Sequence, residues 1–318
     1  MILKQIPEDF VVRELPGYSS GNGTFSIFRL KKKNYTTEKA IQTICKKLRI
    51  DRKSVGYAGI KDRQAVTQQY ISIYKIKKEK AEGLKLNDIE LRFVALSRKP
   101  ISIGNLKGNA FEIVVRNLEK NTKINPDVKI KNFFDEQRFS NNNAEVGRAI
   151  VKKDFKKAVE FILETDGDYE KDVKNFLKEH KNDFVGALRR IPFRILLLFV
   201  HAYQSRMFNE TIEQIDNEKN IEVPMVGFGF ECKDKKIAKI VEAIIKKEGV
   251  SERDFIVQSI PGLSCEGDVR ELYIIPKNLE IGELEKDELN KDKYKVKISF
   301  SLPKGAYATN VIKQIVSQ

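Results

Sequence analysis

The hydrophobic residues of this chain follow one period near its two ends and another in its middle. Apolar and polar residues alternate in 89–96 and 110–116, and again in 296–302, and the segment 271–276 before the last of these also has strand character. Such alternation predicts half-buried strands of an antiparallel sheet. A strand near the end of a chain needs partners, and the opening region offers them.

Further strands and one helix are expected in the opening region. The helix is predicted after Thr36, a typical N-cap residue, because apolar side chains recur at helical spacing between 41 and 48. Residues rich in β-branched and aromatic types predict strands at 10–15, at 24–30 and on both sides of Asp62.

From about residue 143 the apolar positions recur at helical spacing. Helices are predicted around 158–162, 169–177 and 237–245, the last one ending at Gly249. A further helix begins at Pro192 and is apolar on nearly all sides, so we expect it to be buried.

This order of strands, helices and strands predicts an α+β protein of two domains. We expect a mixed, mainly antiparallel sheet built from residues 1–150 and 270–318, with a helix-rich α+β domain inserted at 151–269. A 318-residue chain is long enough for two such domains.

The charge of the chain favours a polyanionic partner but does not establish one. Its 59 Lys and Arg against 45 Asp and Glu give a formal net charge of +14, which points to nucleic acid. A composition rich in both Lys and Glu, without Trp, is also typical of the solvated surface of a heat-adapted protein. The lysines at 31–33 are candidates for phosphate contacts or for plain solvation.

Cysteine usage and hydropathy predict a cytoplasmic protein. The three cysteines are too far apart for a metal knuckle, and an odd number argues against a disulfide framework. The N-terminus lacks a signal-peptide pattern, and the longest apolar run is too short to cross a bilayer. We expect no structural metal, no membrane association and no protein partner, and we expect a monomer.

The sequence lacks the residues and motifs that several classes of reaction require. The only histidines, His180 and His201, lie within predicted helices, which argues against a histidine triad or metal site. Neither a P-loop nor a dinucleotide-binding glycine motif occurs. A carboxylate remains: Asp62 lies between Lys61 and Arg63 on a strand-to-strand connection, where neighbouring cations favour its charged form.

For an isolated Lys-Asp-Arg triplet, a turn or a surface ion pair is the simpler interpretation of Asp62. The surrounding motifs favour catalysis. The segment from Ala58 to Gln69 reads A-G-x-K-D-x-x-A-x-T-x-Q, and four more motifs occur along the chain. They are KQIPEDFVVRE from Lys4, GNLKGNAF from Gly104, NFFDEQRF from Asn132 and FSLPKGAYAT from Phe300.

In these five motifs and their order, the chain resembles the TruD family of tRNA pseudouridine synthases. The resemblance implies a pseudouridine synthase fold whose insertion, 151–269, is the TRUD domain. It also implies isomerisation of uridine to pseudouridine in tRNA, at uridine 13, without a cofactor. Asp62 would start cleavage of the C1′–N1 bond, either by attack or by proton abstraction.

The resemblance also implies roles for four other residues. Lys4 matches the basic residue beside the aspartate, and Phe134 the aromatic residue that stacks on the target base. Asn132 would contact a base edge, and Arg138 a phosphate or the protein itself. The competing interpretations are a surface lysine for Lys4 and a core phenylalanine for Phe134.

Two functions of other classes stay open from the residues alone. A non-catalytic RNA-binding or folding-helper protein would bind tRNA tightly without producing an isomerised base. A metabolic lyase or hydrolase would use Asp62 on a small substrate, and activity on free nucleosides that does not depend on salt would favour it.

Overall fold

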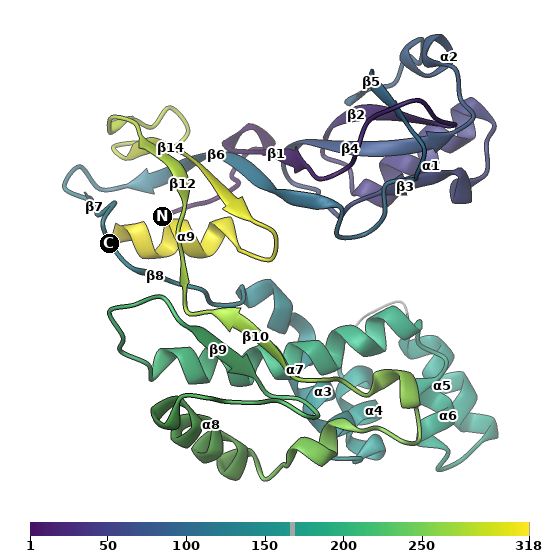
Figure 1. Ribbon diagram of the computed structural model, residues 1–318, viewed down its shortest axis with the longest axis vertical. Coiled ribbons are helices and arrows are strands. Elements are labelled where there is room, and N and C mark those ends of the chain that lie inside the picture. The colour runs from purple at the N-terminus through teal and green to yellow at the C-terminus, as the bar shows by residue number, and fades with distance from the viewer. Residues whose placement is uncertain (166–168, 318) are drawn as a thin grey trace. The chain divides into compact units, whose positions relative to one another are not determined.

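A computed structural model describes residues 1–165 and 169–317 of the chain, which divides into two compact units. The first unit comprises Met1–Val128 and Ile275–Gln318, and the second comprises Lys129–Ile274 (Figure 1). The second unit is thus continuous in sequence and interrupts the first, whose two parts contribute strands to one sheet. The first boundary falls at 128/129, however, rather than near 150.

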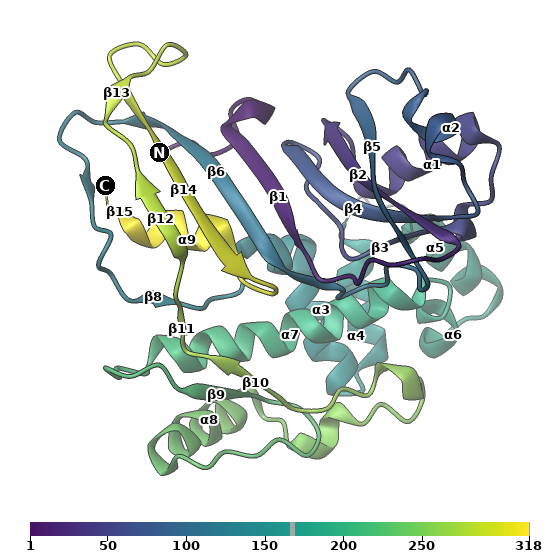
Figure 2. The ribbon, with the colours of Figure 1, turned by 45° about the horizontal axis from the view of Figure 1, so that its top comes forward.

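The first unit is built on one large sheet (Figure 2). Its strand order is β12-β14-β6-β1-β4-β2-β5, with β13 paired to β14 and β3 to β4. β1 and β4 are parallel, and the other pairs are antiparallel, so the expected α+β class with a mainly antiparallel sheet is confirmed.

The strands of the first unit are β1 (Phe10–Pro16), β2 (Phe25–Lys33), β3 (Val55–Tyr57), β4 (Val66–Tyr74), β5 (Ile89–Ser97), β6 (Leu106–Leu118), β7 (Lys123–Ile124), β12 (Lys277–Ile281), β13 (Glu285–Lys286), β14 (Tyr294–Pro303) and β15 (Val316–Ser317). Its helices are α1 (Thr37–Leu48), α2 (Lys78–Glu82) and α9 (Ala308–Ile315), with short 3₁₀ turns η1 (Pro7–Asp9) and η2 (Arg52–Ser54).

The helix α1 covers one face of β2, β4 and β5. The Thr36 hydroxyl accepts a hydrogen bond from the Lys39 N–H, which confirms the expected N-cap. Apolar side chains of α1 pack with Phe28 and Leu30 of β2 and with their neighbours on β4 and β5. Burial of this apolar surface supplies the main stabilisation of this half of the sheet.

The C-terminal strand joins the sheet that the N-terminal residues form. β14 pairs with β6 from Tyr294↔Leu118 to Pro303↔Gly108, and the rings of Phe300 and Phe111 lie 5.6 Å apart. The alternation that predicted these strands matches their burial, because Ile113 and Ile298 are both fully enclosed. Gly305 follows, in the turn before α9, in a left-handed conformation (φ +85°) that glycine adopts without strain.

The second unit consists mainly of helices. It contains α3 (Asn143–Val151), α4 (Phe155–Leu163), α5 (Glu170–Glu179), α6 (Phe184–Leu188), α7 (Phe193–Glu213) and α8 (Lys235–Glu248). The short elements are β8 (Ile130–Lys131), β9 (Glu222–Met225), β10 (Asp268–Glu271) and β11 (Tyr273–Ile274), with 3₁₀ turns η3 (Glu136–Asn142), η4 (Glu252–Phe255) and η5 (Pro261–Leu263). Helix α7 packs against α3 and α8, and Gly249 ends α8 in a left-handed conformation as expected.

Two expected segment boundaries differ from the structure because the residues concerned pack or pair within the second unit. Residues 129–150 belong to the second unit because α3 packs along α7 there. The expected strand at 271–276 is divided between β10, which pairs with β9, and β11, which pairs with β8. Both pairings lie within the second unit, so this segment does not extend the main sheet.

We expect Gly147→Ala to destabilise the second unit. A methyl group at this position of α3 would lie 1.9 Å from the carbonyl oxygen of Phe199 on α7, so the helices would have to separate. Overpacking of this kind lowers the free energy of unfolding by roughly 1–3 kcal/mol. Gly21→Ala is the control, because nothing lies within 4 Å of its added methyl group. Equal urea midpoints for Gly147→Ala and the wild type would contradict this packing.

Candidate active site

Asp62 lies on the segment that connects β3 to β4. These strands are antiparallel, with Gly56 opposite Ser72, so the expected strand-to-strand connection is confirmed. The Asp62 side chain is 44% exposed, and its Oδ2 lies 2.5 Å from the Nζ of Lys4. A half-exposed ion pair of this kind contributes little to stability. The contact instead constrains the orientation of the Asp62 carboxylate.

Lys4 is held on several sides. Its side chain is only 14% exposed, and its ammonium lies 4.1 Å from the centre of the Phe10 ring. The Gln64 side chain donates a hydrogen bond to the Lys4 carbonyl oxygen at 2.6 Å. Lys4 adopts a positive φ of 60°, a conformation that persists in a non-glycine residue only where the surroundings impose it. The N-terminal segment and the Asp62 segment therefore hold each other.

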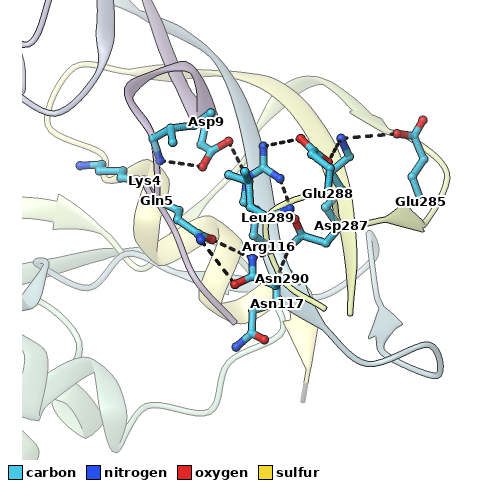
Figure 3. A network of polar contacts seen from close by, with 12 residues as sticks. Lys4, Gln5, Asp9, Arg116, Asn117, Glu285, Asp287, Glu288, Leu289 and Asn290 are labelled. Atoms are coloured by element: carbon cyan, nitrogen blue, oxygen red, sulfur yellow. Dashed lines mark hydrogen bonds and ion pairs between the residues drawn. The ribbon is translucent and has the colours of Figure 1, made fainter. Parts of the chain in front are cut away.

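A buried arginine anchors the N-terminal segment to the sheet (Figure 3). Arg116 of β6 donates 2.8 Å hydrogen bonds to Asp9 of η1 and to Asp287, and a longer one of 3.1 Å to Glu288. All but Glu288 are buried. Loss of one partner would leave an uncompensated charge inside the protein, which is a costly defect.

The same network reaches the chain on both sides of Lys4. The Asp9 carboxylate accepts a hydrogen bond from the Ile6 N–H, and the Asn290 side chain donates one to Gln5 Oε1. On the other side of Lys4, the backbone of Ile2 exchanges two hydrogen bonds with that of Arg116. The position of Lys4 is thus fixed by residues that are far from it in sequence.

The underside of the Asp62 segment is fixed by buried polar side chains. Lys61 forms a 2.7 Å ion pair with Glu14 of β1, and both side chains are buried. The Thr37 hydroxyl accepts a hydrogen bond from the Lys61 N–H and donates one to Gln69, whose amide in turn donates to the Gly59 carbonyl. Several motif residues of this segment therefore act in its architecture.

The three other candidate residues gather within the second unit. Phe134 is buried and packs edge-on against Phe208, with ring centres 5.6 Å apart. The guanidinium of Arg270 lies 4.2 Å from the Phe134 ring centre, and that of Arg138 lies 5.2 Å from it. The Phe134 ring thus packs in the interior of this unit and is flanked by two cations; its stacking role stays a prediction.

Asn132 and Arg138 make hydrogen bonds within the same unit. The Asn132 amide donates to the Glu271 carbonyl at 3.0 Å and accepts from Arg270 at 2.5 Å. Arg138 Nε donates to the Ser205 hydroxyl at 2.8 Å. The structural role that was open for Arg138 is therefore present, while base or phosphate contacts by either residue stay predictions.

The sequence did not reveal the roles of three residues around Asp62 and Phe134. Gln64 and Arg270 belong to no hydrophobic period and to no spaced motif, and their contacts arise only in the folded chain. Lys32 was grouped with Lys31 and Lys33 as a phosphate candidate, and this is wrong because it is only 1% exposed. A signal for Lys32 did exist, since it continues the alternation of Phe28 and Leu30 on the covered face of β2.

Within residues 1–165 and 169–317, no group of three or more His, Cys, Asp or Glu side chains is placed to hold a metal ion. Across the same residues, no helix combines the length and apolar character needed to cross a membrane.

Comparison with known proteins supports the resemblance along the chain. The family model for tRNA pseudouridine synthase D (TruD) matches residues 1–172, 162–221 and 213–315. A Methanocaldococcus jannaschii protein described as a probable tRNA pseudouridine synthase D 2 is 32% identical, over 99% of this chain and 91% of its own length. The tRNA pseudouridine synthase D of Aquifex aeolicus is 29% identical, over 98% of this chain and 97% of its own.

A solved structure gives the same answer for the fold. The crystal structure of a putative tRNA pseudouridine synthase D from Methanosarcina mazei has a TM-score of 0.76 and 27% identity, and covers 98% of this chain and 92% of its own. The mainly antiparallel α+β fold of this chain is thus that of a pseudouridine synthase. The chain belongs to the TruD family of tRNA pseudouridine synthases.

We expect acid to weaken the anchor at Asp287. Burial raises the pKa of this carboxyl, but hydrogen bonds from the Asn117 and Leu289 N–H groups, Asn290 and Arg116 outweigh it and lower the pKa to about 2. The resulting stability is present above the unfolded pKa, near 4, and is lost as pH falls toward 2; for one such group it amounts to about 2–3 kcal/mol.

Asp287→Asn should therefore lower the free energy of unfolding at pH 7, and its difference from the wild type should shrink between pH 4 and pH 2. Urea unfolding at a series of pH values measures this. Glu285→Gln, two residues away on β13, is the control, because Glu285 is 70% exposed. A difference that stays constant with pH would show that the carboxylate does not stabilise the anchor.

Proposed function

We propose that this protein isomerises uridine to pseudouridine in tRNA, that uridine 13 is its target, and that Asp62 carries the reaction without a cofactor. The observation that carries the proposal is the Lys4–Asp62 ion pair on the β3–β4 connection of a TruD family fold. The relatives' names specify tRNA, and the +14 formal charge suits such a polyanion.

The chemistry asks for one carboxylate and no external redox partner. The C1′–N1 bond breaks, the uracil turns, and a C1′–C5 bond forms; C5 loses a proton and N1 gains one, so the atoms balance. Asp62 can begin this either by attacking the sugar or by abstracting a proton from it. Lys4 keeps the carboxylate aimed and balances its charge until the substrate arrives.

Access to the base sets a second requirement. A uridine in a folded RNA has to leave its stack before it can reach Asp62, and aromatic and cationic side chains offset that cost. Phe134, Arg138 and Asn132 are the residues that we propose for this task. Their clustering around Arg270 in the second unit supports a common role.

Replacing Asp62 tests the proposal directly. The wild type, incubated with a tRNA transcript, should give a carbodiimide-dependent primer-extension stop at position 13, and a transcript with cytidine 13 should give none. Asp62→Asn should lower the rate by at least roughly a thousandfold, because the general base or nucleophile is lost. Asp172→Asn makes the same chemical change at an exposed position and should keep the wild-type rate.

Each contrary result has its own meaning. Equal modification by Asp62→Asn would refute the catalytic assignment. A stop at another uridine would refute the target but keep the activity. Tight tRNA binding by the wild type with no isomerised base would favour the non-catalytic RNA-binding alternative.

Lys4→Met should lower the single-turnover rate roughly ten- to a hundredfold, because a carboxylate that is no longer aimed spends less time in a reactive geometry. Lys4→Arg should recover part of the loss, since it keeps the positive charge. The thermal midpoint should change little, as expected for a half-exposed ion pair. A Lys4→Met rate within twofold of the wild type would refute the role of this contact.

A further inference from the structure

Lys32 is a lysine in the interior of the first unit, beneath the Asp62 segment. It lies on β2 opposite Thr67 of β4 and Ile89 of β5, and it is only 1% exposed. Its stem continues the face of β2 that packs under α1. The ammonium therefore has to find its partners inside the protein.

Those partners are backbone carbonyl oxygens. Lys32 Nζ lies 2.6 Å from the carbonyl oxygen of Tyr35, 2.9 Å from that of Asp62 and 3.4 Å from that of Lys61. An ammonium has three donors, so these three acceptors satisfy it. Two of the three belong to the segment that displays Asp62.

A buried ammonium at this position costs more free energy than an apolar side chain would. Within the described part of the chain, the hydrogen-bond acceptors of Lys32 are backbone carbonyls and no carboxylate. Burying a cation without a directly paired anion carries a large desolvation cost, whereas an apolar side chain of similar length would pack there without that cost. Fold stability alone does not explain a lysine here.

We infer that Lys32 is a positioning residue: by binding the carbonyl oxygens of Lys61 and Asp62 it fixes the backbone of the catalytic segment and so aims the Asp62 carboxylate. This inference rests on the proposed function, in which Asp62 carries the reaction. Lys32 does not touch the substrate in this account. Lys32 holds the backbone of Asp62, whereas Lys4 contacts the Asp62 carboxylate itself.

The charge of Lys32 gives this role a pH dependence. Burial lowers the pKa of Lys32 to about 8; the nearby Asp62 carboxylate opposes this change and the Lys61 ammonium adds to it. Each of these neighbours is itself paired, Asp62 with Lys4 and Lys61 with Glu14. Lys32 is therefore a cation at pH 7 and loses its charge as pH rises past about 8, which weakens its bonds to the carbonyls.

Lys32→Met is the direct test, because methionine keeps most of the stem and removes the ammonium. We expect kcat to fall roughly ten- to a hundredfold, as for other misplaced catalytic groups, with the KM for tRNA within about twofold of the wild type. The wild-type kcat should also decrease between pH 7 and pH 9, and this decrease should be absent in Lys32→Met. Lys46→Met removes the same charge from an exposed position of α1 and should keep both the rate and the decrease.

Hydrogen exchange gives a readout that does not depend on activity. Amides of residues 58–65 should exchange faster in Lys32→Met than in Lys46→Met at pH 7, because the segment loses its internal support. Unchanged exchange together with an unchanged kcat would overturn the inference. A decrease above pH 7 that persists in Lys32→Met would also overturn it, because another group would then cause the decrease.

The two proposals fail in different ways. An inactive wild type, or an active Asp62→Asn, refutes the proposed function, whereas an active Lys32→Met beside an inactive Asp62→Asn refutes only the role of Lys32. If Lys32→Met does not fold, Lys32→Arg decides, because arginine stays charged throughout this pH range: a decrease between pH 7 and pH 9 that persists in Lys32→Arg overturns the inference, and its absence supports it.

Discussion

The contact between Lys4 and Asp62 joins two segments that are 58 residues apart, and the candidate site depends on it. The pair is half-exposed and weak by itself, so its geometry has to come from what holds each partner. Arg116 and its acidic neighbours hold the N-terminal segment, while Lys61, Thr37 and Lys32 hold the other. Because both segments are anchored, this weak contact still fixes the orientation of the Asp62 carboxylate. Catalysis depends on that orientation more than on the strength of the ion pair.

The supports share one physical feature, which is charge in the interior. The Lys61–Glu14 pair, the Arg116 network and the Lys32 ammonium all cost desolvation energy that apolar packing would avoid. All three lie beside the segments that carry Lys4 and Asp62. The first unit thus gives up stability where it gains a fixed arrangement of charges, as expected for preorganised electrostatic catalysis.

The sequence predicted what local patterns determine. Alternation located β5, β6 and β14, the Thr36 cap located α1, and the residues around Asp62 located the β3–β4 connection. It did not predict the boundary at 128/129, which depends on α3 packing along α7, or the Arg270 contacts around Phe134. Lys32 is an intermediate case. Its place in the alternation of β2 indicated burial, but a lysine is ordinarily expected at the surface.

A complex with tRNA that carries 5-fluorouridine at position 13 tests the central claim most directly. The account predicts that the fluorinated nucleotide is turned out of its stack and that its sugar lies against the Asp62 carboxylate, with Lys4 still beside it. A complex in which that nucleotide is bound elsewhere, with the Asp62 carboxylate facing only solvent, would contradict the account.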